Sequence, residues 1–306
     1  MDEPRLRIVT GKGGVGKTLV AAGIALRAAR DGKRVLLAEV DAGGQALRLL
    51  GQSAKNSDIV KVEENLAVVN MTPHASMHEY ARLVLKFEIL YRAVFNNRLV
   101  KQFIRQVPSL GELTMLGKIW YHEQETRRDK PRFDLIVLDA PATGHAISML
   151  RAPEGVSRTV PPGSFRINCE RMTRLLTDPQ KTRMHIVTTP EEMPVNEAVE
   201  LEQAASDLLR IPVGTTVINF AQAAWPPSLV DTFKEYQDAG DFGHFCQAML
   251  VREARVTTGE KHLARLPSHM AKESIRLPRL PVQTIEREQL EDFADKLAPL
   301  LAESSA

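Results

Sequence analysis

The sequence predicts an α/β fold, a doubly wound and mostly parallel sheet with a helical subdomain inserted into it. Three observations support this: continuous apolar runs recur along the chain, helical stretches separate them, and a glycine-rich loop joins the first run to the first helix. Strands that are apolar throughout are buried on both faces, which is typical of parallel sheets covered by helices. Right-handed crossovers should connect such strands.

The elements follow in order along the chain. A strand is expected over 5–10, where Leu6, Ile8 and Val9 are apolar, and an alanine- and leucine-rich helix is expected over 19–30. Further buried strands are expected at 34–40 (RVLLAEV), 133–138 (FDLIVL), 184–189 (MHIVTT) and 213–220 (VGTTVINF).

Two insertions interrupt this alternation within a single domain that spans 1–306. Over about 74–127 no strand pattern occurs, but apolar residues such as Phe87 and Leu90 recur at helical spacing, which predicts a helical insertion. That stripe is usually core, and the alternative is a face that binds a partner. Over about 151–182 several prolines predict a short irregular insertion with a helix near 167–176.

A last helix is expected over 284–301, with Leu290, Phe293 and Leu297 on one side and acidic residues on the other. Membrane-surface anchors are normally basic, so this acidity favours a helix packed on the protein.

The amino-acid composition argues against several classes of protein. Forty Lys and Arg residues against 38 Asp and Glu give a net charge of +2, and no basic run occurs, so no nucleic-acid partner is expected. Cys169 and Cys246 are far apart and outside any CxxC pattern, so we expect two buried thiols rather than a disulfide framework or a zinc site. No signal-peptide pattern opens the chain and no window of 18 apolar residues occurs, so we expect a cytoplasmic protein.

Residues 11–18, GKGGVGKT, match the phosphate-binding pattern GxxxxGK[ST] between a predicted strand and a predicted helix. Glycines let successive backbone amides turn toward a phosphate at the positive end of the helix. Lys17 then reaches the outer phosphates, and the Thr18 hydroxyl is a ligand for Mg²⁺. The sequence therefore predicts a P-loop nucleotide-binding protein.

A second motif, residues 133–145 (FDLIVLDAPATGH), places Asp139 at the carboxyl end of a buried strand, where ligands bind in open α/β sheets. Asp139 is the candidate carboxylate that holds Mg²⁺ through a water, and the following loop could sense the γ-phosphate. The alternative is a helix-capping aspartate.

The loop resembles the deviant Walker A of the MinD/ParA/ArsA/nitrogenase-reductase class of P-loop ATPases, because Lys12 stands near its start. The resemblance implies a dimer in which Lys12 contacts the partner's nucleotide. The positive charge of this lysine would stabilise the negative charge in the transition state of phosphoryl transfer. A solvated loop lysine is the alternative.

Within that class the segment DAPATGHAISMLRAP is similar to the DTAPTGHTLRxLxxP of the ArsA arsenite-pump ATPases and of the guided-entry ATPase that targets tail-anchored proteins. Residues 108–113, 190–197, 217–219 and 277–281 resemble further segments of that family. The pattern of AEVDAGGQALRLLG and LTMLGKIW is closest to the ArsA-like ATPases of actinobacteria, which are thought to act as pairs of related subunits.

The resemblance implies roles for individual residues. Asp41 matches the switch I aspartate that orients or deprotonates the attacking water near the metal, Glu191 a nucleotide-contacting glutamate, and Asn219 an amide that reads adenine. Helix capping is the alternative for Asp41 and Asn219. The implied nucleotide contacts are Gly11, Lys12, Gly13, Gly14, Val15, Gly16, Lys17, Thr18, Leu19, Glu191, Asn219, Pro278 and Leu280; the implied metal contacts are Thr18, Asp41 and Asp139; and the implied catalytic residues are Lys12, Lys17 and Asp41.

The chain also departs from the family. The family's DPAHS is DAGGQ at residues 41–45, and Ser148 and Glu200 stand where the family has arginines. Neither the zinc-binding cysteine pair of the targeting ATPases nor a close cysteine set for a metalloid is present, and the client-binding insert is short and poor in methionine.

The resemblance thus implies an ATPase that binds ATP and Mg²⁺ and works as a nucleotide-driven dimeric switch. Its partner would be itself or a paralogous ArsA-like subunit, with a membrane protein or another hydrophobic protein as a further client. Two alternatives stay open: a positioning switch like MinD and ParA, and a catalytically weak subunit of a heteromeric complex.

Overall fold

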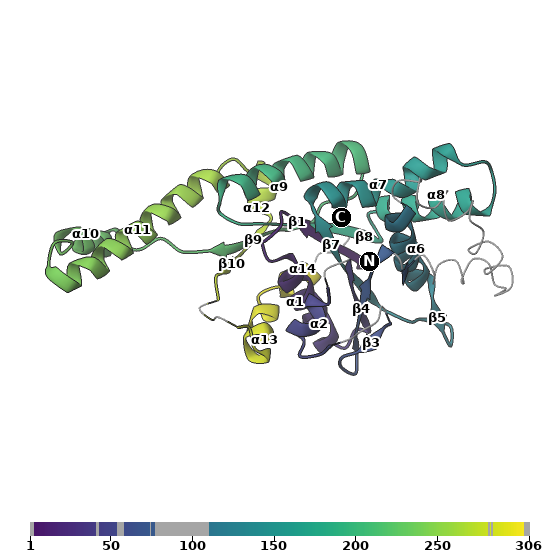
Figure 1. The fold of residues 1–306 in the computed structure, drawn as a ribbon, viewed down its shortest axis with the longest axis horizontal. Coiled ribbons are helices and arrows are strands. Elements are labelled where there is room, and N and C mark those ends of the chain that lie inside the picture. The colour runs from purple at the N-terminus through teal and green to yellow at the C-terminus, as the bar shows by residue number, and fades with distance from the viewer. Residues whose placement is uncertain are drawn as a thin grey trace.

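The computed structural model describes residues 3–40, 43–53, 58–73, 75–76, 110–280, 282 and 284–302. Its centre is an eight-stranded sheet in the order β10-β9-β8-β1-β7-β2-β4-β3 (Figure 1). The pairs are parallel except for β3 with β4, and the expected doubly wound α/β fold is confirmed. The strands of this sheet are β1 (Leu6–Gly11), β2 (Val35–Val40), β3 (Val60–Lys61), β4 (Leu66–Met71), β7 (Leu135–Ala142), β8 (Thr182–Thr188), β9 (Thr216–Ala221) and β10 (Ser274–Pro278); a separate hairpin pairs β5 (Thr126–Arg127) with β6 (Lys130–Pro131).

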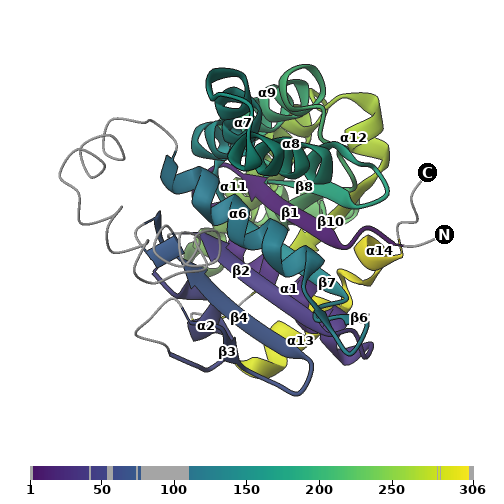
Figure 2. The ribbon, with the colours of Figure 1, turned by 90° about the vertical axis from the view of Figure 1, so that its right-hand side faces the viewer.

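Helices cover both faces of the sheet, which Figure 2 shows from the side. One face carries α1 (Lys17–Arg30), α2 (Gln45–Leu49), α13 (Arg287–Asp295) and α14 (Ala298–Leu301). The other face carries α6 (Leu110–Gln124), α7 (Thr143–Thr159), α8 (Ser164–Thr177), α9 (Glu192–Ala204), the π-helical turn η1 (Ala205–Leu209), the C-terminal part of α11 (Gly240–Leu263) and α12 (Ser268–Lys272). The remaining helix is α10 (Pro227–Glu235), which packs on α11.

The strands read as continuous apolar runs because successive side chains enter two different cores. On β2, Leu36 and Ala38 pack under α6 and α7, whereas Val35 and Leu37 pack under α1. All six residues of β2 are buried. The expectation of strands buried on both faces is therefore confirmed.

Two details differ from the expectation. Strands β4 and β10 were not expected: β4 mixes buried and half-buried residues, and β10 is an edge strand that ends at Pro278, a position that proline tolerates. The segment expected to be irregular, 151–182, is largely helical: α7 continues through Pro153 to Thr159 and α8 follows. Of the helical insertion at 74–127, α6 is confirmed as a helix, while 77–109 lie outside the described residues.

The expected last helix is two short helices, α13 and α14, and its apolar side is packed on the protein as predicted. Leu290, Phe293 and Leu297 are buried in the core beneath α1. Contact is so close there that a Cβ on Gly23 of α1 would stand 2.7 Å from Leu297. Both cysteines are free and buried, as expected. Of the helices in the described ranges, none is long and apolar enough to cross a membrane.

One part of the chain leaves the body. Helix α10 and the first half of α11 extend past the β10 edge and form one end of the molecule's long axis (Figure 1). We call residues 225–252 the arm. The rest of α11 returns to the body, where Gly259 lies against Pro190.

Candidate functional site

The P-loop joins β1 to α1 at the carboxyl edge of the sheet. Gly14 and Gly16 adopt φ values of 89° and 91°, which L side chains rarely adopt. A Cβ on Gly16 would also lie 2.4 Å from the Asn219 side-chain nitrogen. No side chain among the described residues caps α1, so its first amides are available to an anion at the positive helix end.

Lys17 lies in the first turn of α1 and turns back across the loop. Its Nζ donates a hydrogen bond to the Lys12 carbonyl oxygen at 3.1 Å. Burial lowers the pKa of Lys17, while the nearby carboxylates of Asp139 and Glu197 act in the opposite direction. The Lys17 amine is therefore partly shielded from water and lies near acidic groups. A bound phosphate would add negative charge and so favour the protonated form of Lys17.

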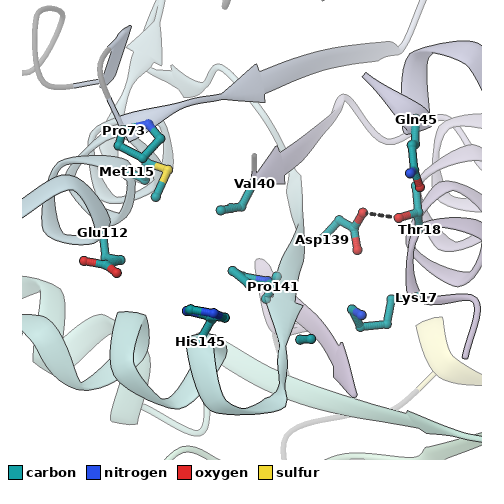
Figure 3. A pocket seen from close by; sticks show the side chains of 12 residues that line it. Lys17, Thr18, Val40, Gln45, Pro73, Glu112, Met115, Asp139, Pro141 and His145 are labelled. Carbon is teal, nitrogen blue, oxygen red and sulfur yellow. Dashed lines mark hydrogen bonds between the residues drawn. The ribbon is translucent and has the colours of Figure 1, made fainter. Parts of the chain in front are cut away.

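Thr18 and Asp139 meet as the sequence predicts, although 121 positions separate them. The Thr18 hydroxyl donates to Asp139 Oδ2 at 2.6 Å (Figure 3). Asp139 is within β7 rather than at a helix N-terminus, so the capping alternative is wrong. The pKa of Asp139 is raised to about 6, mainly by burial and also by Glu39, against the lowering effects of the Thr18 hydrogen bond and of Lys17.

These two residues fit a small divalent cation. The second carboxylate oxygen of Asp139, Oδ1, is buried and has no hydrogen-bond partner in the described part of the chain. A hydroxyl and a carboxylate are hard oxygen donors, which Mg²⁺ prefers, and Mg²⁺ usually keeps several waters and takes few protein ligands. The described residues contain no group of three or more His, Cys, Asp or Glu suited to a metal.

Glu39 is a second carboxylate at this edge, and the sequence reasoning missed it. It is the register partner of Asp139 on the neighbouring strand β2 and is fully buried. Its Oε1 accepts the backbone N–H groups of Gln45 and Ala46 at 2.6 and 3.1 Å, while Oε2 has no partner among the described residues. Burial raises its pKa. The available signal was a lone charge within the apolar run RVLLAEV.

Lys12 is bound within its own chain. Its Nζ forms an ion pair with Glu197 of α9, and the Thr143 hydroxyl donates to the other oxygen of Glu197 at 3.2 Å. Glu197 thus joins the P-loop to the first residue of α7, directly after the Asp139 strand. Lys12 is therefore an ion-paired lysine rather than a simply solvated one, and its contact with a partner's nucleotide stays a prediction.

Asn219 is buried near the end of β9 and faces the P-loop. Its Nδ2 donates to the Val15 carbonyl at 2.9 Å, and its buried Oδ1 lacks a partner in the described structure. The capping alternative is wrong, because the next helix, α10, begins at Pro227 after Pro226. The reading of adenine by Asn219 stays a prediction.

Two cavities meet at Lys17 and Thr18. One, of about 660 Å³, is lined by P-loop residues with Leu19, Arg48, Thr284 and Ile285. The other, of about 410 Å³, extends past Asp139 to Glu112 of α6 and His145 of α7 (Figure 3). An extended phosphate ligand therefore has room on both sides of the P-loop.

The remaining predicted site residues are more scattered. Glu191 lines a third cavity, of about 680 Å³, with Phe220 and Arg279. Pro278 is exposed at the end of β10 and Leu280 packs against the core under α1, so Thr284 and Ile285 line the P-loop cavity in their place. Asp41 lies outside the described residues.

The chain is similar to proteins of a known ATPase family. Residues 5–161 match the family model described as anion-transporting ATPase. The chain is 31% identical over 226 residues to the ATPase BagA of Mycobacterium tuberculosis, covering 70% of this chain and 64% of that protein. It is 29% identical over 206 residues to an arsenical pump-driving ATPase of Escherichia coli, covering 66% of this chain and 32% of that protein. The chain thus spans less than two thirds of the length of these relatives.

Proposed function

The chain belongs to the anion-transporting ATPase family, and from this premise we propose that it binds ATP with Mg²⁺ and hydrolyses it to drive a dimeric switch. One observation carries the proposal: the hydrogen bond of Thr18 to Asp139, beside a buried carboxylate oxygen that has no partner. A P-loop hydroxyl and a strand-end carboxylate in contact form the magnesium-holding pair of P-loop nucleotidases.

The residues of the candidate site then have separate roles in ATP binding and hydrolysis. The amides at the start of α1 and the Lys17 amine bind the phosphates and stabilise the charge that develops on them. Thr18 and Asp139 hold Mg²⁺, which when bound neutralises charge on the β- and γ-phosphates. Asp41 would orient the attacking water; this role rests on the sequence resemblance.

Glu197 connects the phosphate site to α7. Because Lys12 and Thr143 share its carboxylate, a ligand that draws Lys12 toward phosphate would also change the contact at the start of α7. A nucleotide could in this way favour one arrangement of the loop after β7 over another, as a two-state switch requires. The partner of that switch is proposed to be a second copy or a paralogous subunit, acting on a hydrophobic client protein.

The positioning-switch alternative, like MinD and ParA, receives less support. Such a protein would use an amphipathic helix near the end of the chain as a reversible anchor, but the apolar side of α13 is buried against α1. This observation favours the first function.

The test is phosphate release from ATP with and without Mg²⁺, with the molar mass measured by light scattering in ADP or a non-hydrolysable ATP analogue. We expect Mg²⁺-dependent release and a mass that differs between the two nucleotides. Asp41→Asn should bind ATP yet release phosphate slowly; an unchanged rate would remove Asp41 from the catalytic set. ATP binding without release in the wild type would indicate a catalytically weak subunit instead.

A further inference from the structure

The arm exposes several large apolar side chains to solvent. Helix α11 has 24 residues, and only Gly243, Cys246, Gly259 and Leu263 are buried. Phe242 and Phe245 are 53% and 51% exposed. Since a large apolar side chain gains free energy when it leaves water, a helix with two such exposed phenylalanines is suited to a contact outside its own chain.

The aromatic side chains of the arm form one continuous ladder. Phe233 contacts Phe245, and Phe245 stacks on Phe242 with ring centroids 6.0 Å apart. Trp225 extends the ladder at the base and Tyr236 at the tip. The ladder therefore offers a single apolar strip rather than scattered side chains.

The arm is also held in a fixed direction. At its base, Arg252 lies 4.5 Å from the Trp225 ring centroid and donates to the Ala223 carbonyl oxygen. At its tip, a Cβ on Gly243 would stand 2.6 Å from the Gln237 carbonyl oxygen, so the turn packs directly on α11. A surface that is already ordered loses less conformational entropy when it binds.

The tip of the arm, which we define as residues 231–241, is rich in acidic side chains. Asp231, Glu235, Asp238 and Asp241 are exposed between 225 and 248, and Lys234 is the one Lys or Arg in that stretch. Lys234 is itself paired with Asp231 at 3.0 Å. An anionic membrane would be repelled by this tip, so its charge favours a basic protein surface.

Helix α8 has the complementary surface. Ile167, Arg171 and Arg174 follow one another at spacings of four and three residues, all exposed, so they share one face of the helix. Ile167 is 45% exposed. Neither arginine forms a side-chain ion pair within the described part of the chain, whereas Arg166 is paired with Glu170.

The arm and α8 lie toward opposite ends of the long axis (Figure 1). A two-fold axis across the long axis therefore brings the arm of each copy to the α8 face of the other, and both contacts form together. We propose that a second copy of this chain covers the arm, with the Phe242 and Phe245 strip against Ile167 and the acidic tip against Arg171 and Arg174.

Reciprocal charge reversal tests this contact. One variant reverses the tip (Asp238→Arg with Asp241→Arg), and the other reverses α8 (Arg171→Glu with Arg174→Glu). Each variant alone places like charges at both contacts, so we expect its dimer dissociation constant to rise at least about tenfold relative to wild type. Mixed one to one, the two variants place opposite charges at both contacts and should form a heterodimer close to wild-type strength.

Light scattering in ADP and in the non-hydrolysable ATP analogue measures these masses, and circular dichroism checks that each variant is folded. Phe242→Ser with Phe245→Ser is a second route, because it removes the apolar strip without changing charge and should also weaken the dimer. The arm contact is overturned by a wild type that is monomeric in both nucleotides, by reversals that leave the dimer unchanged, or by folded variants that do not associate when mixed.

The arm contact rests on the self-association proposed above, but the two can fail separately. Phosphate release by the wild-type chain reports the proposed function independently of the reversals. Normal ATP turnover with no arm-dependent dimer would refute the contact alone. An arm-dependent dimer without turnover would refute the ATPase proposal alone.

Discussion

The body of the sheet and the arm are stabilised in opposite ways. In the body, functional side chains come from distant segments and are buried: Thr18 meets Asp139 across 121 positions, and Asn219 meets Val15 across 204. In the arm, the ladder joins residues no more than about twenty positions apart, and much of it stays in water. The site therefore depends on the whole fold, whereas the arm depends mainly on contacts between residues that are close in sequence.

The largest expected effect contrasts two phenylalanines. Phe293 is buried beneath α1, so Phe293→Ala should lower the free energy of unfolding by about 3–5 kcal/mol, through lost burial and a cavity. Phe242→Ala on the arm should lower it by less than about 1 kcal/mol. Denaturant unfolding at low protein concentration, where association is weak, measures both. Equal losses would mean that the arm is part of the cooperative core.

The next effect concerns the site itself. Asp139→Asn removes the charge that would hold Mg²⁺, so phosphate release should fall by a factor of about 10²–10³. The matched control is Asp134→Asn, the same change just before the other end of β7, where Asp134 pairs with Arg34. The control should keep most of its rate. A similar loss in both variants would point to damage to β7 rather than to the site.

The third effect is a dependence on pH. The pKa of Asp139 is raised to about 6 in the fold, so keeping this carboxylate ionised destabilises the protein above that pH. Without Mg²⁺, Asp139→Asn should therefore be more stable than wild type at pH 7, by on the order of 2 kcal/mol. This advantage should shrink as the pH falls through 6 toward 4, where the wild-type carboxyl is protonated in the folded state.

Thermal unfolding of both proteins from pH 4 to 8 measures that difference. Comparing the two chains at each pH cancels the contribution of His122, whose pKa is lowered by burial. A stability difference that stays constant across the range would contradict the raised pKa of Asp139.

The smallest effect separates two glycines. Gly16→Ala forces a side chain into a positive φ and toward Asn219, so it should destabilise the protein by roughly 1–2 kcal/mol and weaken nucleotide binding. Gly155→Ala lies inside α7 with open space around the new Cβ, so it should stabilise by about 0.5–1 kcal/mol. Thermal unfolding and nucleotide titration give the signs; an unchanged affinity in Gly16→Ala would show that the loop can relax.

Some strands and helices of the fold could be predicted from the sequence, and others could not. The central strands β1, β2, β7, β8 and β9 could be predicted, because burial on both faces demands continuous apolar runs. Strands β4 and β10 could not, since both lie toward the sheet edges and mix buried with half-buried or exposed residues instead of forming a fully buried apolar run. The prolines predicted an irregular segment over 151–182, but α7 continues through Pro153, whose lost hydrogen bond the packed helix tolerates.

The P-loop and the buried carboxylate Asp139 could be identified from local patterns, namely a glycine-rich loop between a strand and a helix and one acidic residue in an apolar strand. Only the tertiary structure decided that Glu39 stands beside Asp139 and that Glu197 holds Lys12. It also decided that α13 is covered while the arm is not. Strand register and helix packing determine which side chains, distant in sequence, come together in a buried site. Local sequence patterns do not specify these long-range contacts.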